Sequence, residues 1–145
     1  MKIISAQRGV GLIEVLITVL LISTALLALS SLQARSLQFN NSAYVRSQAN
    51  IFAYDIIDRI RITGTTIAPD QFNIGFNDAL PAGAAPQQVA VNQWRTNLAN
   101  SIAGARGRVD CNAAGFCTIE IRWAEQNSSG NVQEDESTFS YTVQL

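Results

Sequence analysis

The chain has 145 residues, of which 48% are hydrophobic and 14% are charged. This length corresponds to about one domain, and the charge content is below the ~25% usual for soluble domains. Ten lysine and arginine residues against eleven acidic ones leave a net charge of −1, without the basic excess typical of nucleic-acid-binding proteins. Histidine is absent, which excludes Ser-His-Asp and Cys-His catalytic sites and histidine-bearing zinc sites. We therefore expect no nucleic-acid partner, no cofactor, no metal and no enzymatic activity.

The shortage of charge is concentrated near the amino terminus. Residues 15–34 carry no charged side chain, and a run of twenty such residues is about long enough to cross the hydrocarbon core of a bilayer. Lys2 and Arg8 precede this run without any acid, which by the positive-inside rule keeps the amino terminus in the cytoplasm. An ordinary secretory signal cut near Ala28-Leu29-Ser30 is the alternative, but its apolar stretch is only about 7–15 residues long. The run therefore predicts a membrane-spanning helix.

Glu14 is the only charged residue between Val10 and Ala34. A charge at the centre of a transmembrane helix costs about 2.5–3.5 kcal/mol and less near an end, while the helix dipole favours an acid in the first turn by about 0.3–1 kcal/mol. These effects explain why Glu14 is tolerated, but not why it is present. A more specific hypothesis is that cleavage after Gly9 frees the α-amine of Val10, and that the amine of a neighbouring copy neutralises Glu14 within a bundle of helices.

These residues resemble a known signature. Arg8-Gly9, followed by Val10-Gly11-Leu12-Ile13-Glu14-Val15-Leu16-Ile17, is similar to the processing site of type IV pilins and type II secretion pseudopilins. The resemblance implies that prepilin peptidase cleaves between Gly9 and Val10, that Val10 is N-methylated, and that Glu14 guides subunit packing. Val10 stands where the family most often has phenylalanine. The implied domains are a leader at 1–9, a transmembrane and fibre-core helix at 10–34, and a periplasmic or extracellular head at 35–145.

The helical pattern continues beyond the apolar run and ends near Gly64. Asp55 and Arg59 form a favourable i,i+4 pair, worth about 0.2–0.5 kcal/mol. A single helix over 10–62 would extend about 80 Å, so we expect its outer half to pack within the head. Apolar residues at spacings of three and four provide the packing face: Val45, Ala49, Phe52, Ala53, Ile56 and Ile60.

Prolines and small residues predict a loop from Gly64 to Gln88. Asp70 and Asp78 lie in this loop but lack the dense oxygen-ligand spacing of a calcium site. Apolar residues at helical spacing then predict a second, shorter helix over 89–103. Trp94 in this helix and Trp123 further on each lie on an apolar periodic face, which favours a place in the core over a ligand-stacking site.

In the last third of the chain, apolar and polar residues alternate at 117–124 and 139–145, which predicts two half-buried strands. Residues 106–111 are expected to form a strand before them. Residues 127–131 are typical of a connector between the last two strands. The sequence thus predicts an α+β fold in which the outer half of a long helix packs on a small antiparallel sheet of about three strands, with one short extra helix.

Cys111 and Cys117 flank a short turn that contains Gly115. Two cysteines are too few for a thiolate zinc site, and their spacing differs from that of a C-x-x-C redox pair. If the chain leaves the cytoplasm, a disulfide is expected, and it would stabilise the head by about 2–2.5 kcal/mol. Reactive thiols are the alternative, although no basic catalytic residues are grouped around the cysteines in the sequence.

Acidic residues near the carboxyl end offer an enzymatic alternative. Glu120, Glu125 and the run Glu134-Asp135-Glu136 would supply the acid and base of a hydrolase with two carboxylates. A solvated strand edge and loop explain these residues more simply. We therefore predict a structural protein rather than an enzyme.

Two further segments narrow the resemblance. Residues 53–61 resemble the end of the long helix in PilV-type minor pilins, and residues 119–123 resemble a strand of that group. This implies a type IV pilin fold and a minor pilin that primes or joins a pilus and supports its assembly, adhesion or twitching motility. A minor pseudopilin of a type II secretion system is the alternative within the family. A head that binds a surface, DNA or a partner adhesin is a second hypothesis of a different class.

The implied partners are prepilin peptidase, other minor and major pilins, the inner-membrane assembly platform, the membrane itself and a tip adhesin. The implied location is the bacterial inner membrane before assembly, with the head in the periplasm, and the extracellular pilus afterwards. Removal of the leader would take away Lys2 and Arg8, leaving eight basic and eleven acidic residues and a side-chain balance of −3. The exported subunit would thus be acidic.

Overall fold

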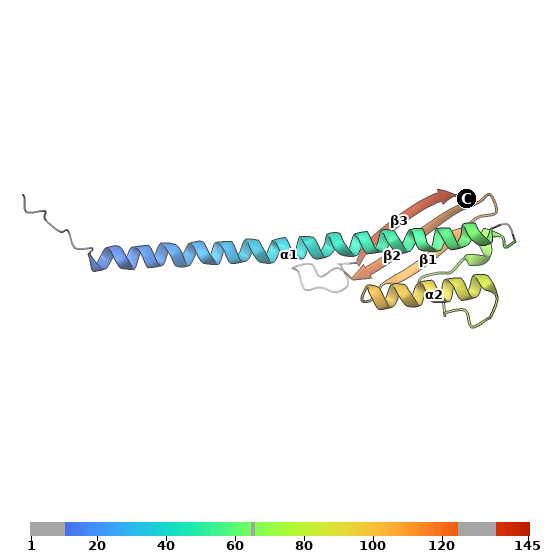
Figure 1. Cartoon of the computed structure of the whole chain (residues 1–145), viewed down its shortest axis with the longest axis horizontal. Helices are drawn as coiled ribbons and strands as arrows, with labels where there is room; N and C mark the ends of the chain where they lie inside the picture. Colours follow the sequence, from blue (N-terminus) through green and yellow to red (C-terminus); the bar gives the residue numbers. More distant parts are fainter. Residues whose placement is uncertain (1–10, 65, 125–135) are drawn as a thin grey trace, which may run out of the picture. The chain divides into compact units, whose positions relative to one another are not determined.

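A computed structural model gives the structure of the chain and describes residues 11–64, 66–124 and 136–145. The chain divides into two compact units, Met1–Asn41 and Ser42–Leu145, which we call the amino-terminal unit and the head. Six elements follow one another along the sequence (Figure 1): helix α1 (Leu12–Thr63), the 3-10 helix η1 (Pro69–Phe72), helix α2 (Pro86–Ser101), and strands β1 (Arg106–Cys111), β2 (Phe116–Ala124) and β3 (Glu136–Gln144).

In the amino-terminal unit, every residue of α1 from Leu12 to Asn41 is exposed. Four hydroxyl groups in this stretch donate to carbonyl oxygens three or four residues earlier in the helix, at 2.7–2.9 Å. A satisfied hydroxyl makes no demand for a polar partner outside the helix, so the segment suits an apolar environment. The residues concerned are Thr18, Ser23, Thr24 and Ser30.

The head is built on an antiparallel sheet with the strand order β1-β2-β3. The carboxyl-terminal part of α1 and helix α2 cover one face of this sheet (Figure 1). Tyr54 of α1 lies on Tyr141 of β3, with ring centroids 5.2 Å apart, and Trp94 of α2 lies on β1 beside Gly107. The expected α+β architecture, with the outer half of the long helix on a small antiparallel sheet, is therefore confirmed.

The core of the head contains the apolar stripe predicted for α1. Ala49, Ala53, Ile56 and Ile60 are all 0–1% exposed, whereas Val45 and Phe52 at the edges of the stripe are partly buried. Trp94 and Trp123 are buried as well, at 0% and 3% exposed. These side chains share one cluster with inward residues of all three strands, so the head has a single hydrophobic core.

Helix α2 begins three residues earlier than predicted, at Pro86 instead of Val89. Pro86 occupies the first turn of the helix, where the missing N–H of proline costs nothing and its fixed φ suits helical geometry. The sequence did not indicate this role because Pro86 lies in a proline-rich stretch that is typical of a loop. The predicted loop also contains η1, whose Phe72 is fully buried, because this segment closes one end of the core.

The strands agree with their predicted positions, except that β2 begins one residue earlier than expected, and β3 begins three residues earlier and ends one residue earlier. In β1 and β2 the inward residues are buried and the outward ones are not, as expected for a sheet with one solvated face. The proposed connector at 127–131 lies outside the described residues.

Candidate functional site

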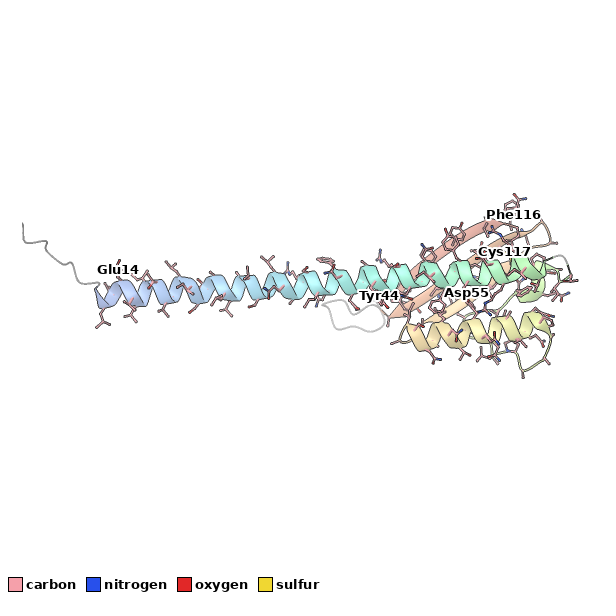
Figure 2. All side chains as sticks on the ribbon, viewed as in Figure 1. Glu14, Tyr44, Asp55, Phe116 and Cys117 are labelled. Carbon is pink, nitrogen blue, oxygen red and sulfur yellow. A yellow bond between two sulfur atoms is a disulfide. The ribbon has the colours of Figure 1, made fainter. Side chains whose placement is uncertain are left out.

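Glu14 lies in the first turn of α1, which places its carboxylate at the favourable end of the helix dipole. The amide of Glu14 donates to the carbonyl oxygen of Gly11 at 2.9 Å, so the helix is formed at this point. Figure 2 labels Glu14 near the start of the helix, among apolar side chains that point outward. Gly9 and Val10, the predicted cleavage and methylation residues, lie outside the described residues.

The amino-terminal part of α1 is apolar on all sides. By length and composition, α1 includes a segment able to cross a membrane, and none of that segment is buried within the protein. Between Leu12 and Phe39, fifteen large apolar side chains are 49–81% exposed. A helix that is hydrophobic all round belongs in lipid or within a larger assembly, so this segment is the strongest candidate for an assembly surface in the described chain.

Cys111 and Cys117 form the disulfide that was expected for an exported chain. They are directly opposite residues at the ends of β1 and β2, and both are buried. The turn between them is closed by Asn112, whose side-chain oxygen accepts hydrogen bonds from the backbone amides of Ala114 and Phe116 at 3.1 and 3.0 Å. The cysteines are therefore structural and do not form a thiol site.

The same turn holds the carboxyl-terminal residue. Gly115 has a φ of +83°, a left-handed conformation that favours glycine, and a Cβ there would lie 3.1 Å from the carbonyl oxygen of Leu145. The amide of Leu145 donates to the carbonyl oxygen of Gly115 at 2.8 Å. This hydrogen bond extends the pairing next to β2 by one residue beyond the end of β3, to Leu145.

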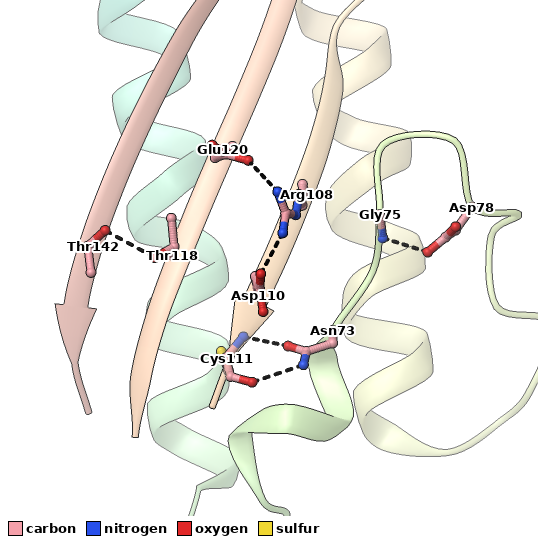
Figure 3. A network of polar contacts seen from close by, with 9 residues as sticks. All are labelled: Asn73, Gly75, Asp78, Arg108, Asp110, Cys111, Thr118, Glu120 and Thr142. Atoms are coloured by element: carbon pink, nitrogen blue, oxygen red, sulfur yellow. Dashed lines mark hydrogen bonds and ion pairs between the residues drawn. The ribbon is translucent and has the colours of Figure 1, made fainter. Parts of the chain in front are cut away.

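One edge of the sheet is closed by the segment after η1 (Figure 3). The side-chain amide of Asn73 donates to the carbonyl oxygen of Cys111 at 2.9 Å, and its oxygen accepts the Cys111 N–H at 2.6 Å. Ile74 continues this pairing through two backbone hydrogen bonds with Val109, each 3.0 Å long. Because an exposed edge strand invites pairing with other chains, this segment protects β1.

The solvated face of the sheet carries a compact polar network (Figure 3). Arg108 donates to Glu120 at 3.1 Å and to Asp110 at 2.5 Å, and the hydroxyls of Thr118 and Thr142 lie 3.1 Å apart. Glu120, which we considered as a catalytic acid, is therefore engaged in an ion pair. The other acids of that alternative are Glu136, which is exposed at the start of β3, and Glu125, Glu134 and Asp135, which lie outside the described residues.

Two groups in the head have perturbed ionisation. The hydrogen bond with Tyr141 raises the pKa of Tyr54 above its usual value of 10.0, and the electrostatic effect of Tyr141 and some desolvation act in the same direction. Burial lowers the pKa of Arg95, and the nearby carboxylate of Asp78 opposes this shift. Asp78 itself accepts the Gly75 N–H at 2.6 Å (Figure 3), so it closes a turn of its own loop.

Within residues 11–64, 66–124 and 136–145, no three His, Cys, Asp or Glu side chains are grouped as metal ligands.

Comparisons with known proteins add no relative: no family model, no curated protein and no solved structure matches the chain significantly.

Three features of the head were missed by reasoning from the sequence. They are the edge protection by Asn73, the closing of the turn by the side chain of Asn112, and the gathering of three arginines around one loop. An asparagine before a predicted turn is the signal that would have indicated the role of Asn112, whereas Asn73 lies within the predicted loop, where asparagine is common. The arginines are at positions 95, 106 and 122, too far apart in the sequence to form a charged run.

Proposed function

We propose that the chain is a structural subunit of a fibre of the type IV pilin class, a minor pilin with the type IV pilin fold. In this proposal prepilin peptidase removes residues 1–9, Val10 becomes the methylated amino terminus, and α1 anchors the head to the inner membrane until the subunit joins the pilus. The observation that carries the proposal is the exposed apolar part of α1 with Glu14 in its first turn.

The dimensions of the segment support a passage from lipid to a fibre core. Its 23 residues from Leu12 to Ala34 correspond to about 35 Å of helix, close to the ~30 Å hydrocarbon thickness of a bilayer. The next charged residue, Arg35, comes directly after it. Both lipid and a bundle of like helices would cover these side chains, and covering each one is worth about 1.5–3 kcal/mol. Transfer between the two environments therefore keeps the apolar surface away from water.

Glu14 would then determine when the transfer happens. Its carboxylate is exposed on the helix surface and, in a packed bundle, would need a cationic partner, because an unpaired buried charge is strongly destabilising. The free α-amine of Val10 in a neighbouring subunit supplies that charge only after cleavage. This coupling would restrict assembly to processed subunits.

The processing step is tested by co-expressing the chain with a prepilin peptidase and measuring its intact mass. We expect a chain that begins at methylated Val10, and we expect Gly9→Val to block cleavage. Gly11→Ala is the matched control, since a Cβ at Gly11 meets no atom closer than 3.9 Å and cleavage should be normal. An amino terminus near Ser31 would instead support a secretory signal and overturn the proposal.

The packing step is tested with Glu14→Gln, which removes the charge and keeps the shape of the side chain. We expect this variant to be processed and membrane-bound but absent from sheared fibres, with at least a tenfold loss. Thr18→Val, one turn further along the same helix, keeps the charge and should be incorporated normally. Incorporation of Glu14→Gln at the normal level would refute the role of the carboxylate.

A minor pseudopilin of a type II secretion system is the second candidate, because it would share the leader and the helix. Crosslinking of the intact subunit in its native host separates the two, as its neighbours would be either pilus subunits or components of a secretion channel. Deletion of the gene tests the other hypothesis, in which the head is a binding module that the fibre displays. Lost fibres support a role in assembly, whereas normal fibres with lost adhesion support binding.

A further inference from the structure

Three arginines from three different elements surround the loop formed by Phe76, Asn77 and Asp78. Arg95 of α2 donates to the carbonyl oxygens of Phe76 and Asp78 at 2.7 and 2.9 Å. Because these bonds use both terminal nitrogens of its guanidinium, Arg95 fixes the loop against the helix. The other two arginines lie on the solvated face of the sheet, next to the loop.

Arg106 of β1 and Arg122 of β2 are directly opposite each other in the sheet register. Arg106 donates one hydrogen bond to the side-chain oxygen of Asn77, at 3.1 Å. The guanidinium carbon of Arg122 lies 4.1 Å from the ring centroid of Phe76, in a cation–π contact. The loop therefore holds both guanidinium groups at neighbouring positions.

Neither guanidinium is neutralised within the part of the chain that the structure describes. Ion pairs between described residues involve Arg59, Arg61 and Arg108, and no carboxylate of the described residues lies within 4.0 Å of Arg106 or Arg122. Like charges directly opposite each other in a sheet are destabilising. Two cations held side by side in this way indicate a place for a bound anion.

The orientation of Arg122 favours capture at the end of the side chain. Its Nε is buried and has no hydrogen-bond partner in the described part of the chain, while the residue as a whole is only partly buried, which leaves the two terminal nitrogens as the donors for a ligand. Paired terminal N–H groups match the two oxygens of a carboxylate or phosphate. Arg106 keeps donors free beside them, because it uses a single hydrogen bond to Asn77.

We propose that Arg106 and Arg122 form a binding site for one oxyanion, the carboxylate or phosphate group of an external ligand, with Phe76 and Asn77 holding the two guanidinium groups in place. This inference does not rest on the proposed role in a fibre. The ligand can be a free phosphate or an acidic sugar, since both present the same oxygen geometry.

The surroundings favour a single anionic group over a nucleic acid. The next row of the sheet pairs Arg108 with Glu120, and Asp110 follows. Glu136 is exposed one row beyond Arg122 on β3. A nucleic acid needs a stripe of cations along its backbone, whereas here acids border a pair of arginines.

The site is tested on the full-length protein in non-ionic detergent micelles, by following arginine Nε–Hε resonances in NMR spectra during titration at constant ionic strength. The probes are inorganic phosphate, glucuronate and a single-stranded oligonucleotide. We expect saturable shifts of the Arg106 and Arg122 signals with phosphate, with glucuronate or with both, and the stronger of the two identifies the source of the oxyanion.

Variants separate a built site from general charge attraction. Arg106→Gln and Arg122→Gln should each weaken binding about tenfold, the effect of losing one charge-assisted hydrogen bond. Arg106→Lys keeps the positive charge but loses the paired N–H donors of the guanidinium group, so it should also weaken binding. Arg61→Gln is the matched control, an exposed arginine paired with Asp58 on α1, and should bind normally.

Several results would overturn the site. Failure of both phosphate and glucuronate to produce saturable shifts would do so, and so would equal binding by wild type and Arg122→Gln. Full binding by Arg106→Lys would reduce the site to unspecific attraction. Binding of the oligonucleotide at least a hundredfold tighter than phosphate, with a steep loss on adding salt, would indicate a nucleic-acid surface instead.

Discussion

Gly107→Ala tests how closely α2 covers the sheet. A Cβ at this position would lie 2.3 Å from Cη2 and 2.7 Å from Cζ3 of Trp94, and 3.1 Å from Cδ2 of Leu98. Carbon atoms in contact normally lie about 3.5–4.0 Å apart, so the new methyl group overlaps the indole ring by more than an ångström. Trp94 is 0% exposed and cannot turn outward to make room without opening the core.

Two effects contribute to the expected loss of unfolding free energy. Overfilling a packed core usually costs about 1–3 kcal/mol. Displacing the ring also strains the hydrogen bond from Nε1 of Trp94 to the carbonyl oxygen of Phe52, now 2.8 Å long, which is worth about 1 kcal/mol. We therefore expect Gly107→Ala to lower the free energy of unfolding by about 2–4 kcal/mol. The sign of the change in unfolding free energy is informative, because an alanine that fits in place of glycine stabilises a protein by about 0.4–1 kcal/mol.

Urea unfolding of the full-length protein in detergent, followed by tryptophan fluorescence, measures this difference, since Trp94 and Trp123 are both buried. Trp94→Phe provides the partner for a double-mutant cycle, as it removes the ring atoms that Gly107→Ala would meet. In that background the cost of Gly107→Ala should fall by at least half. An unchanged cost, or a single variant as stable as wild type, would refute the close approach of α2 to β1.

Reducing the Cys111–Cys117 disulfide should lower the free energy of unfolding by about 2.4 kcal/mol, the loop-closure value for seven residues, and a variant with both cysteines replaced by alanine should not respond to reductant. Asn73→Ala should cost about 2 kcal/mol in the same urea assay, because it removes two hydrogen bonds to the backbone of Cys111; an effect below 0.5 kcal/mol, small on the ~1 kcal/mol scale of one such bond, would contradict the edge protection. The raised pKa of Tyr54 means that the folded state holds this proton more tightly than the unfolded state. Its contribution to stability should be complete below pH 10.0 and be lost as the pH rises through the raised pKa. Tyr54→Phe should make the fall above pH 10.0 smaller, and an identical pH curve would show that the contact with Tyr141 has no such effect.

Much of the fold could be predicted because its signals are local. The apolar run, the stripe from Val45 to Ile60 and the alternation in β2 and β3 each follow from the period of one element. The disulfide was expected from two cysteines in an exported chain, and the strand register shows why it can form, because Cys111 and Cys117 are directly opposite each other. The start of α2 was missed because Pro86 belongs both to a proline-rich loop and to the first turn of a helix.

The two candidate sites also differ in how far the sequence predicts them. Glu14 could be identified from the sequence because a single carboxylate in an apolar run is unusual wherever the chain folds, and the resemblance to prepilins rests on neighbouring residues. The pairing of Arg106 with Arg122 depends on the register of two strands. Their attachment to Phe76 and Asn77 depends on a loop that lies 29 or more positions earlier in the sequence.

The sequence by itself determined the apolar helix, its one carboxylate, the order of helices and strands and the cysteine pair, because each of these is specified by residues close together in the chain. The tertiary structure alone decided which edge of the sheet is protected, how α2 approaches Gly107 and where Arg106 and Arg122 meet. Those features arise from contacts between segments that are distant in sequence, and such contacts depend on how the elements pack around the core rather than on any local pattern.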